Sequence, residues 1–521
     1  MSETHYDVVI IGSGAGGGAL ALRLATTGKR ILLLERGDYL KRERDNWDSK
    51  AVFVDGRYQT TEQWYSAEGK AFHPGLHYVV GGNTKVYGGA LFRLRERDFG
   101  EVIHCDGVSP AWPIPYAVFE PYYLEAERLF HVHGLRGADP TEPPSSGPYP
   151  HAPVAHEPRI QALCDALERE GHHPFPQPLA ILLDERDGVV APHSPCVRCD
   201  AYDGFPCLTN GKADAQIICV DPAVAHANVT LLTGAYVERL DTDPSGRTVT
   251  AVRVARGGAR ETYRGDIVVT ACGALSSALL MFRSASHAHP AGLANGSDQV
   301  GRNYMRHNNS ALMAISRSRN DTVFQKTMAL NDFYFGAPDW EFPLGGIQML
   351  GKSHGEQVRA EALPGFMSFF PETPFDELAR RSMDFWVMTE DLPRPENRIQ
   401  LGADGRVTLD VAPTGGEAHR RLRHKLESLL SKADAHPHLL ERSLYLGKGI
   451  PIGGTAHQAG TMRFGTDPNS SVLDLNCRAH EVDNLYGVDA GFFPSIGAVN
   501  PTLTIIANAL RVGDHLIERM G

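Results

Sequence analysis

The hydrophobic pattern at the start of the chain predicts a strand, a helix and a second strand in close succession. Val8–Ile11 is an unbroken apolar run, which is typical of a parallel strand buried on both faces. An Ala- and Leu-rich stretch follows, in which Leu20 and Leu24 share one helical face and Gly28 marks the end. Arg30–Leu34 is the next apolar run. The chain therefore opens with a strand–helix–strand unit.

Later apolar runs predict more strands and only a few long helices. A β-rich run, a turn, another strand and a buried strand leading into a glycine turn are expected at Asn228–Glu238, Asp243–Gly246, Val249–Val254 and Asp266–Leu275. Helices are expected around Arg159–Glu170 and over the charged stretch Glu417–Lys432. Residues 38–72 show no clear period and predict loops. The fold class expected is α/β (α+β).

The loop after the first strand has the composition of a dinucleotide-binding turn. Gly12, Gly14 and Gly17 form a G-x-G-x-x-G motif between strand and helix. Glycines allow a tight turn, close approach of the backbone to a pyrophosphate, and packing of the helix on the strand. Glu35 ends the second strand and can accept ribose hydroxyls, while its charge would repel a 2′-phosphate. The motif alone does not separate FAD from NAD.

Composition narrows the class of protein. The 521 residues allow two lobes, and 62 acidic against 51 basic residues do not indicate a nucleic-acid-binding protein. The N-terminus enters the first strand almost at once, without room for a signal peptide, and no apolar run reaches membrane-spanning length. Eight cysteines in so long a chain do not form a disulfide framework. We therefore expect a soluble cytoplasmic protein with no membrane partner.

One cysteine-rich segment admits two interpretations. His193, Cys196, Cys199 and Cys207 are suitable zinc ligands by type. A closed zinc site normally shows a second tight pair of ligands, and Cys219 stands alone. A loop of reduced cysteines packed near the dinucleotide domain is therefore favoured, and no metal is predicted.

The segment His77–Gly89 contains two glycine pairs around small polar residues, a composition that lets backbone lie against a flat ligand. It resembles the Gly-Gly loop that lies over the isoalloxazine ring in the glucose-methanol-choline (GMC) oxidoreductase family. Family members with covalent flavin carry a histidine in this loop, where this chain has Lys85. The resemblance implies FAD held without a covalent bond, and a Lys85 close to the ring could favour anionic reduced flavin.

The C-terminal region strengthens the resemblance. His457-Gln458-Ala459-Gly460-Thr461 is similar to the family's H-x-x-G-T motif, whose histidine is the catalytic base, and Asn500 precedes Pro-Thr-Leu-Thr, where the family has His or Asn. The implied reaction removes the hydroxyl proton with neutral His457 and transfers hydride to flavin N5, while Asn500 positions the oxygen. The implied FAD contacts are Gly12, Gly14, Gly17, Glu35, Gly82, Asn83, Thr84, Lys85, Val237, Ala271, Asp489, Gly491, Asn500, Pro501 and Thr502.

The resemblance also implies the domain organisation. A Rossmann-like FAD-binding domain is expected from residues 1–100, 185–309 and 445–521, with a substrate-binding domain of sheet and helices at 310–444 and a connecting or lid segment at 101–184. The resemblance covers roughly the first hundred residues, Cys196–His307 and the last seventy-five residues, and it covers the substrate domain only thinly. The candidates for polar substrate contacts are Phe324–Thr327, with Gln325 in it, Gln348 and Arg394, although ordinary surface or sheet residues explain them at least as well.

The expected substrate follows from the branch of the family. The loop, the cysteine segment and Thr389–Arg398 look most like bacterial pyranose-oxidase-like enzymes, including oxidases of the C3 hydroxyl of C-glycosides. We expect oxidation of a secondary hydroxyl, at C3 or C2, of a sugar or glycoside, with O₂ or a quinone as electron acceptor. A GMC-fold lyase, a dehydrogenase of a non-sugar alcohol and a flavoprotein without turnover remain alternatives. The sequence leaves the oligomeric state open.

Overall fold

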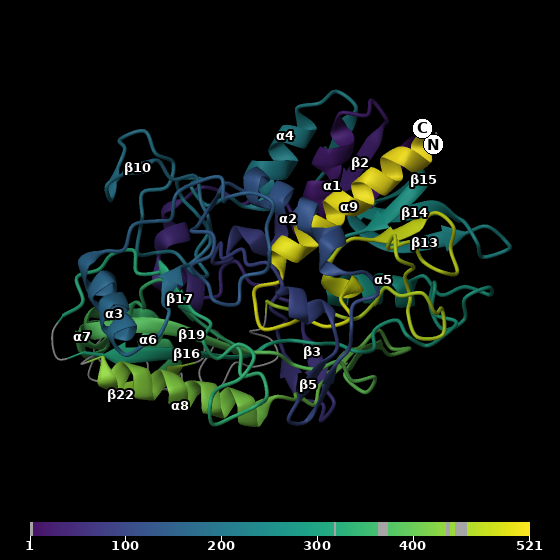
Figure 1. Cartoon of the computed structure of the whole chain (residues 1–521). Coiled ribbons are helices and arrows are strands. Elements are labelled where there is room, and N and C mark those ends of the chain that lie inside the picture. Colours follow the sequence, from purple (N-terminus) through teal and green to yellow (C-terminus); the bar gives the residue numbers. More distant parts are fainter. Residues whose placement is uncertain (1–3, 317–318, 363–372, 434–437, 443–455) are drawn as a thin grey trace.

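The computed structural model describes residues 4–316, 319–362, 373–433, 438–442 and 456–521. Within these ranges the chain forms two lobes, each built on its own large sheet, and the first and last elements of the chain lie in the same lobe (Figure 1). Residues 445–455, the start of the third predicted segment of the FAD-binding domain, and residue 444 of the predicted substrate domain lie outside the described residues.

A seven-stranded sheet organises the first lobe. Its strand order is β12-β2-β1-β15-β14-β13, with β23 beside β15, and the five strands β12, β2, β1, β15 and β23 pair in parallel. The strands are β1 (Thr4–Ile11), β2 (Ile31–Leu34), β12 (Val229–Leu232), β13 (Tyr236–Thr242), β14 (Val249–Arg256), β15 (Ala259–Thr270) and β23 (Leu485–Gly487). The predicted N-terminal strand–helix–strand unit is present, with α1 (Ala15–Ala25) as its helix.

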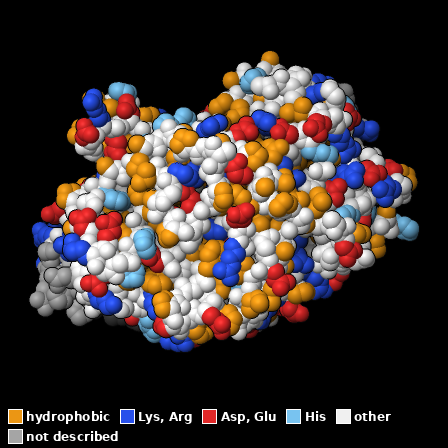
Figure 2. Space-filling model, in the orientation of Figure 1, with side chains coloured by type: hydrophobic (Ala, Val, Ile, Leu, Met, Phe, Trp, Pro, Cys, Tyr) orange, Lys and Arg blue, Asp and Glu red, His pale blue; other side chains and the backbone are white. Residues whose placement is uncertain are grey.

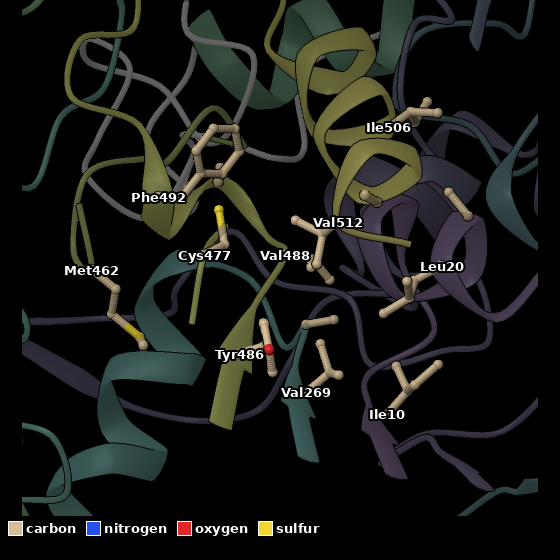
Figure 3. Close-up of a cluster of buried hydrophobic side chains, with 14 of the residues drawn as sticks. Ile10, Leu20, Val269, Met462, Cys477, Tyr486, Val488, Phe492, Ile506 and Val512 are labelled. Atoms are coloured by element: carbon tan, nitrogen blue, oxygen red, sulfur yellow. The ribbon is translucent and has the colours of Figure 1, made fainter. Parts of the chain in front are cut away.

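The core of this lobe lies between the parallel strands and two helices. Leu20 on α1 and Ile506 and Val512 on the C-terminal helix α9 (Thr502–Met520) pack over Ile10 and Val269 of the central strands (Figure 3). All five side chains are fully buried. Burial of an aliphatic side chain of this size contributes about 1.5–3 kcal/mol, so the apolar runs recognised in the sequence supply much of the lobe's stability.

A six-stranded antiparallel sheet organises the second lobe, in the order β22-β16-β19-β18-β17-β8. The strands are β22 (His438–Arg442), β16 (Asn308–Ile315), β19 (Ser382–Thr389), β18 (Gly346–Met349), β17 (Met328–Leu330) and β8 (Phe175–Pro176). Helix α8 (Gly416–Lys432) buries Leu422, Leu426 and Leu429 against this sheet, and α3 (Pro158–Arg169) adds to the same core. The i, i+4, i+7 spacing of these leucines places them on one helical face.

The other elements are short. The strands of the two-stranded and four-stranded sheets are β3 (Trp64–Ser66), β4 (Ala71–Phe72), β5 (Val102–His104), β6 (Gly107–Ser109), β7 (Val132–His133), β9 (Leu179–Ala180), β10 (Glu185–Arg186), β11 (Val189–Val190), β20 (Arg398–Leu401) and β21 (Val407–Asp410). The further α-helices are α2 (Tyr116–Leu129), α4 (Asp221–Val224), α5 (Ala274–Arg283), α6 (Gly355–Ala362) and α7 (Thr373–Arg381). No helix in the described ranges is long and apolar enough to cross a membrane.

The structure confirms the mixed α/β class and both predicted long helices, which begin one residue earlier than expected. It distributes the segment 101–184 over both lobes: α2 packs on α9, whereas β8 pairs with β17 at the edge of the second sheet. Residues 38–72 contain two short helical turns and strands β3 and β4, and β3 pairs with β21 from the predicted substrate domain. Strands from residues 38–72 and from the predicted connecting segment 101–184 therefore pair with strands of the predicted substrate domain.

On the face shown in Figure 2, acidic and basic side chains are interspersed with apolar ones, without a broad patch of one sign. The formal net charge of the chain is −11. This face shows no basic stripe of the kind that tracks a nucleic-acid backbone.

Candidate active site

A large cavity runs from the carboxyl ends of the parallel strands to the second sheet. Its walls come from segments spread over almost the whole chain. Residues that line it include Gly12, Gly14, Glu35, Gly82, Asn83, Thr84, Val237, Ala271, Asp489, Pro501 and Thr502 of the first lobe, Asn309, Gln348 and Trp386 of the second sheet, and Lys326, His457 and Asn500. Ligands of open α/β sheets bind at this edge of the strands.

The glycine turn is built for close approach. Gly12 has φ +103°, and a Cβ there would collide with the carbonyl oxygen of Ala271. A Cβ at Gly17 would collide with the carbonyl oxygen of Gly12, so Gly17 serves helix packing and does not line the cavity. Gly14 caps α1 and borders open space. The first turn of α1 carries no acidic side chain, so its free N–H groups and positive dipole end suit a pyrophosphate.

Glu35 lies at the end of β2 on the cavity wall. Its carboxylate accepts hydrogen bonds from the Ser13 hydroxyl at 2.6 Å and from the Ser13 and Gly37 backbone N–H groups at 3.1 and 2.8 Å. Burial raises the pKa of the Glu35 carboxyl, and these three donors oppose that effect. Since each carboxylate oxygen can accept more than one hydrogen bond, Glu35 can still bind ribose hydroxyls.

Next to Glu35 the cavity wall carries arginines and tyrosines that no sequence motif marks, and Arg36 is ion-paired at 2.5 Å with Glu62, which also lines the cavity. The Arg36 guanidinium lies 3.9 Å from the ring centroid of Tyr78 and 4.5 Å from that of Tyr236. Arg283 also lines this end of the cavity, near Val237. Cations and flat rings suit the phosphates and the adenine of a dinucleotide.

The glycine-rich loop lies along the cavity as predicted for Gly82, Asn83 and Thr84. Asn83 fixes the preceding segment, because its side-chain oxygen accepts the His77 N–H at 3.0 Å and its amide donates to the Gly75 carbonyl at 3.1 Å. The Thr84 hydroxyl donates to the Gly81 carbonyl and accepts the Ala215 N–H. These contacts hold the loop so that its backbone faces the cavity.

Lys85 does not line the cavity, in contrast to its predicted contact with FAD. Its ammonium forms an ion pair with Asp214 at 2.8 Å, and both side chains are buried. The 3₁₀ turn Gly82–Lys85 directs this side chain away from the cavity. The Lys85 charge is therefore paired with Asp214 and does not reach the cavity wall, where the sequence suggested that it could favour anionic flavin.

His457 is held by a second histidine, His307. The two Nδ1 atoms lie 2.8 Å apart, and His307 Nε2 lies 2.8 Å from the Gly497 carbonyl oxygen. A carbonyl only accepts, so His307 Nε2 carries the hydrogen and neutral His307 Nδ1 accepts. His457 Nδ1 must then donate. The remaining nitrogen of His457, Nε2, keeps a free lone pair.

Both imidazoles are neutral at ordinary pH, as this arrangement requires. Burial lowers the pKa of His307 to about 4. Burial, followed by the proximity of His307 and Lys326, lowers the pKa of His457 well below 6.5. His457 is therefore a base that is already free of its proton.

The Gly497 peptide that orients the histidines is itself anchored. Its N–H donates to the buried Glu390 carboxylate at 2.9 Å, and the next N–H, of Ala498, donates to the Tyr334 hydroxyl at 2.9 Å. Gly497 has φ +61°, and a Cβ there would lie 2.7 Å from Leu94. Glycine is thus required at the position that sets the histidine tautomers.

Asn500 is oriented by Gln348 of β18. The Gln348 amide donates to the Asn500 side-chain oxygen at 2.8 Å, which leaves the Asn500 amide hydrogens available. His457 and Asn500 line the same cavity. Together they present a hydrogen-bond acceptor and a hydrogen-bond donor, the pair that a hydroxyl group needs.

Some of the other predicted residues line the cavity, and others lie behind its wall. Asp489 lines the cavity and accepts from Gly491 N–H and Ser277, whereas Gly491 lies behind the wall. Gln325 is buried and donates to Asp384 at 2.8 Å, so its amide serves the second lobe's interior. Gln325 and Arg394 are both absent from the cavity wall, in contrast to their predicted substrate contacts.

The cysteine segment shows no metal-binding geometry in the described part of the chain. All eight cysteines are free thiols, and among the residues that the structure describes no group of three or more His, Cys, Asp or Glu side chains is arranged to hold a metal ion. Burial raises the pKa of Cys196 to about 11 and that of Cys199 to about 12. Cys196 is buried and Cys199 half-buried, and both are protonated thiols at neutral pH.

Comparison with known proteins agrees with this geometry. The chain matches the FAD binding domain over residues 7–82 and GMC oxidoreductase over residues 186–309 and 448–509. It is 33% identical to 6'''-hydroxyparomomycin C oxidase of Streptomyces lividus, over 100% of this chain and 92% of that protein. It is 31% identical to paromamine 6'-oxidase of Streptomyces fradiae, over 99% and 92% of the two chains.

Among solved structures, pyridoxine 4-oxidase from Mesorbium loti shares the fold, with a TM-score of 0.65, 20% identity, and coverage of 98% of this chain and 99% of that one. The glycine turn, Glu35 and the arginines and tyrosines of the cavity wall fit FAD, which is the cofactor of this enzyme. With full-length similarity above 30% and the family's motifs in place around one cavity, the chain belongs to the GMC oxidoreductase family.

Proposed function

We propose that this FAD-dependent enzyme oxidises a hydroxyl group of a sugar or glycoside, with His457 as the base and Asn500 as the group that holds the oxygen. The observation that carries the proposal is the pairing of a free acceptor on His457 with a free donor on Asn500 in the cavity that fits FAD. The similar proteins named for oxidation of paromamine and a hydroxyparomomycin support a sugar-containing substrate.

The chain's own residues prepare the hydroxyl. The substrate O–H donates to Nε2 of His457, while its oxygen accepts from the amide of Asn500. When bound, FAD supplies the two-electron acceptor for the carbon-bound hydrogen. Loss of the proton makes the substrate oxygen more negative, and the Asn500 amide stabilises that charge without adding a charge of its own.

His307 keeps His457 oriented during the proton transfer. When His457 takes the proton, its Nδ1–H keeps its acceptor on His307, so the ring does not rotate between steps. The Gly497 carbonyl keeps His307 in the accepting tautomer. This role is that of an orienting group behind a general base.

The position of oxidation stays a prediction. The resemblance suggests a secondary hydroxyl at C3 or C2, including that of C-glycosides, whereas the name of one similar protein specifies position 6'. O₂ or a quinone as electron acceptor also stays a prediction, as does retention of FAD without a covalent bond.

Anaerobic reduction of the bound flavin tests the proposal. The purified yellow protein would be mixed with glucose, methyl glucosides, an aryl C-glucoside, paromamine and simple non-sugar alcohols, and flavin bleaching followed by stopped flow. Bleaching by at least one sugar is expected, and NMR of the product gives the position oxidised. Bleaching by non-sugar alcohols alone, or product formation with fully oxidised flavin, would replace the proposal by a non-sugar dehydrogenase or by a lyase.

Release of the yellow colour into the supernatant after acid precipitation tests the non-covalent attachment. Flavin that stays with the precipitated polypeptide would contradict it.

A further inference from the structure

The cavity wall contains a buried cation that the oxidation chemistry leaves without a role. We propose that Lys326, held by Asp203 and lining the same cavity as Asn309 and Trp386, forms a recognition site for a second hydroxyl of an uncharged sugar, close to the hydroxyl that is oxidised. This inference rests on the proposed function and adds to it the chemical class of the substrate and the residues that select it.

Lys326 has unused donors in a buried position. Its side chain is 4% exposed, and its ammonium lies 2.8 Å from Asp203 Oδ1. Asp203 is held in turn by the Gly351 N–H. An ammonium has three N–H donors, and in the described part of the chain Asp203 accepts the one hydrogen bond found for it. A buried cation with unfilled donors on a cavity wall is costly unless a ligand supplies acceptors.

The ion pair lies at the reacting end of the cavity. It sits directly on Gly88 of the glycine-rich loop, because a Cβ at Gly88 would collide with Asp203 and lie 2.6 Å from the Lys326 ammonium. The positive charge of Lys326 also acts on His457. A group bound by Lys326 is therefore a neighbour of the hydroxyl bound by His457.

Two side chains of the second sheet complete the site. The Asn309 side-chain oxygen on β16 is buried and has no hydrogen-bond partner in the described residues. Trp386 on β19 lines the same cavity. A donor, an unfilled acceptor and a flat aromatic side chain around one cavity match a sugar, which offers hydroxyls at its edge and C–H groups on its faces.

The charges favour an uncharged ligand. Lys326 and Asp203 together have no net charge, so neither a carboxylate nor an ammonium gains from the pair as a whole. A substrate ammonium beside Lys326 would meet a like charge close to His457, and a carboxylate would meet Asp203. A neutral hydroxyl can donate to Asn309 and accept from Lys326 without either penalty.

Substitution of Lys326 in the FAD-loaded enzyme tests the proposal. Lys326→Met is expected to lower kcat/KM for the best sugar of the panel by about 10–100-fold, the usual effect of losing a hydrogen bond to a charged group. FAD content should not change. The matched control is Lys425→Met, which removes the Lys425–Asp339 pair on α8 at the surface and should change kcat/KM less than about twofold.

Lys326→Met leaves the half-buried Asp203 carboxylate without its cationic partner, and this alone can destabilise the fold. The double variant Lys326→Met/Asp203→Asn removes both charges and serves as the control for misfolding of the single variant. The selective readout is a series of monodeoxy analogues of that sugar. The wild type should discriminate against one analogue that lacks a hydroxyl next to the oxidised carbon, and the double variant should treat this analogue and its parent alike.

A second readout is the acid limb of the flavin reduction rate. His307 and Lys326 are the titratable and charged groups that act on His457. Removal of the Lys326 charge should move the acid limb to higher pH, a change that a purely structural lysine near the surface would not produce.

The outcomes separate this inference from the proposed function. If the double variant keeps the wild-type kcat/KM and the wild-type discrimination between parent and deoxy analogue, the recognition site is refuted and sugar oxidation stands. If no sugar bleaches the flavin or perturbs its absorbance on binding, both fail together. If an amino sugar is preferred over its hydroxyl counterpart at the discriminating position, the assignment to an uncharged sugar is wrong.

Discussion

The two ends of the cavity are built from different materials. At the phosphate end, backbone atoms and glycines form the wall, and a Cβ at Gly12 or Gly17 would collide with a carbonyl oxygen. At the substrate end, the wall consists of side chains from strands β16, β18 and β19 and from Lys326. A wall of backbone is fixed by the fold, whereas a wall of side chains can be altered by single substitutions. The first end is therefore suited to one cofactor and the second to varied substrates.

The difference between the two ends of the cavity is tested most strongly at His457, where the proposed chemistry depends on one side chain. His457→Ala should slow anaerobic flavin reduction by sugar about 10²–10⁴-fold, because a positioned base is lost. Asn500→Ala should slow it less, since the base remains. FAD content should stay at the wild-type level in His457→Ala. A near wild-type reduction rate in His457→Ala would remove the histidine from the mechanism.

At the backbone-built end, Gly12 and Gly14 form a matched pair. Gly12→Ala should destabilise the protein by roughly 2–4 kcal/mol, because φ +103° and a collision with Ala271 oppose a side chain. Gly14→Ala meets nothing within 4 Å and should fold normally. Thermal unfolding of the FAD-free variants measures the difference.

FAD titration then separates folding from cofactor binding. We expect Gly14→Ala to bind FAD more weakly than wild type, because its Cβ enters the space that the pyrophosphate needs. Equal unfolding temperatures for the two FAD-free variants would mean that the fold does not require glycine at position 12.

A smaller effect is expected at Gln348, which touches the chemistry only through Asn500. Gln348→Leu should lower the flavin reduction rate about 10-fold, because the Asn500 amide is no longer held with its donors free. Gln161→Leu on the exposed face of α3 is the control and should have no effect. An unchanged rate in Gln348→Leu would show that Asn500 keeps its orientation by other means.

The smallest change is expected on varying pH around neutrality. Neutral His457 is the active form, and burial together with His307 and Lys326 lowers its pKa well below 6.5. The protonated fraction is then small at pH 6.5, so flavin reduction should be constant from there upward and fall only at more acidic pH. A half-maximal rate at pH 6.5 or above would contradict this assignment.

Sequence patterns predicted the parts of the site that are local. The glycine turn, the β1–α1–β2 unit and the pairing of an H-x-x-G-T histidine with Asn500 each depend on residues close in the chain or on a family motif. The same patterns misplaced Lys85, because the direction of one side chain in a 3₁₀ turn is set by its partner Asp214, far along the chain.

Contacts between distant segments escaped prediction for the same reason. His307 lies 150 residues before His457, and Gln348 lies 152 residues before Asn500. Neither pair has a spacing signal, since the second sheet brings them together only after folding. Asn309 was equally hidden, because an unfilled acceptor is defined by what surrounds it in space, whereas Lys326 lies in the stretch Phe324–Thr327 that the sequence offered for polar ligand contacts.

Helix α9 gives the molecule a practical property. Asn500 stands just before this helix, α9 packs along α1, and the two helices approach so closely that a Cβ at Gly513 would lie 2.7 Å from Arg23. The amide proposed to hold the substrate oxygen thus follows directly on a helix that is braced against α1, whose first turn suits the phosphates of FAD. A protein engineer can therefore exchange residues on β16 and β19 in search of new substrates while the distance between cofactor and amide stays fixed by this helix pair.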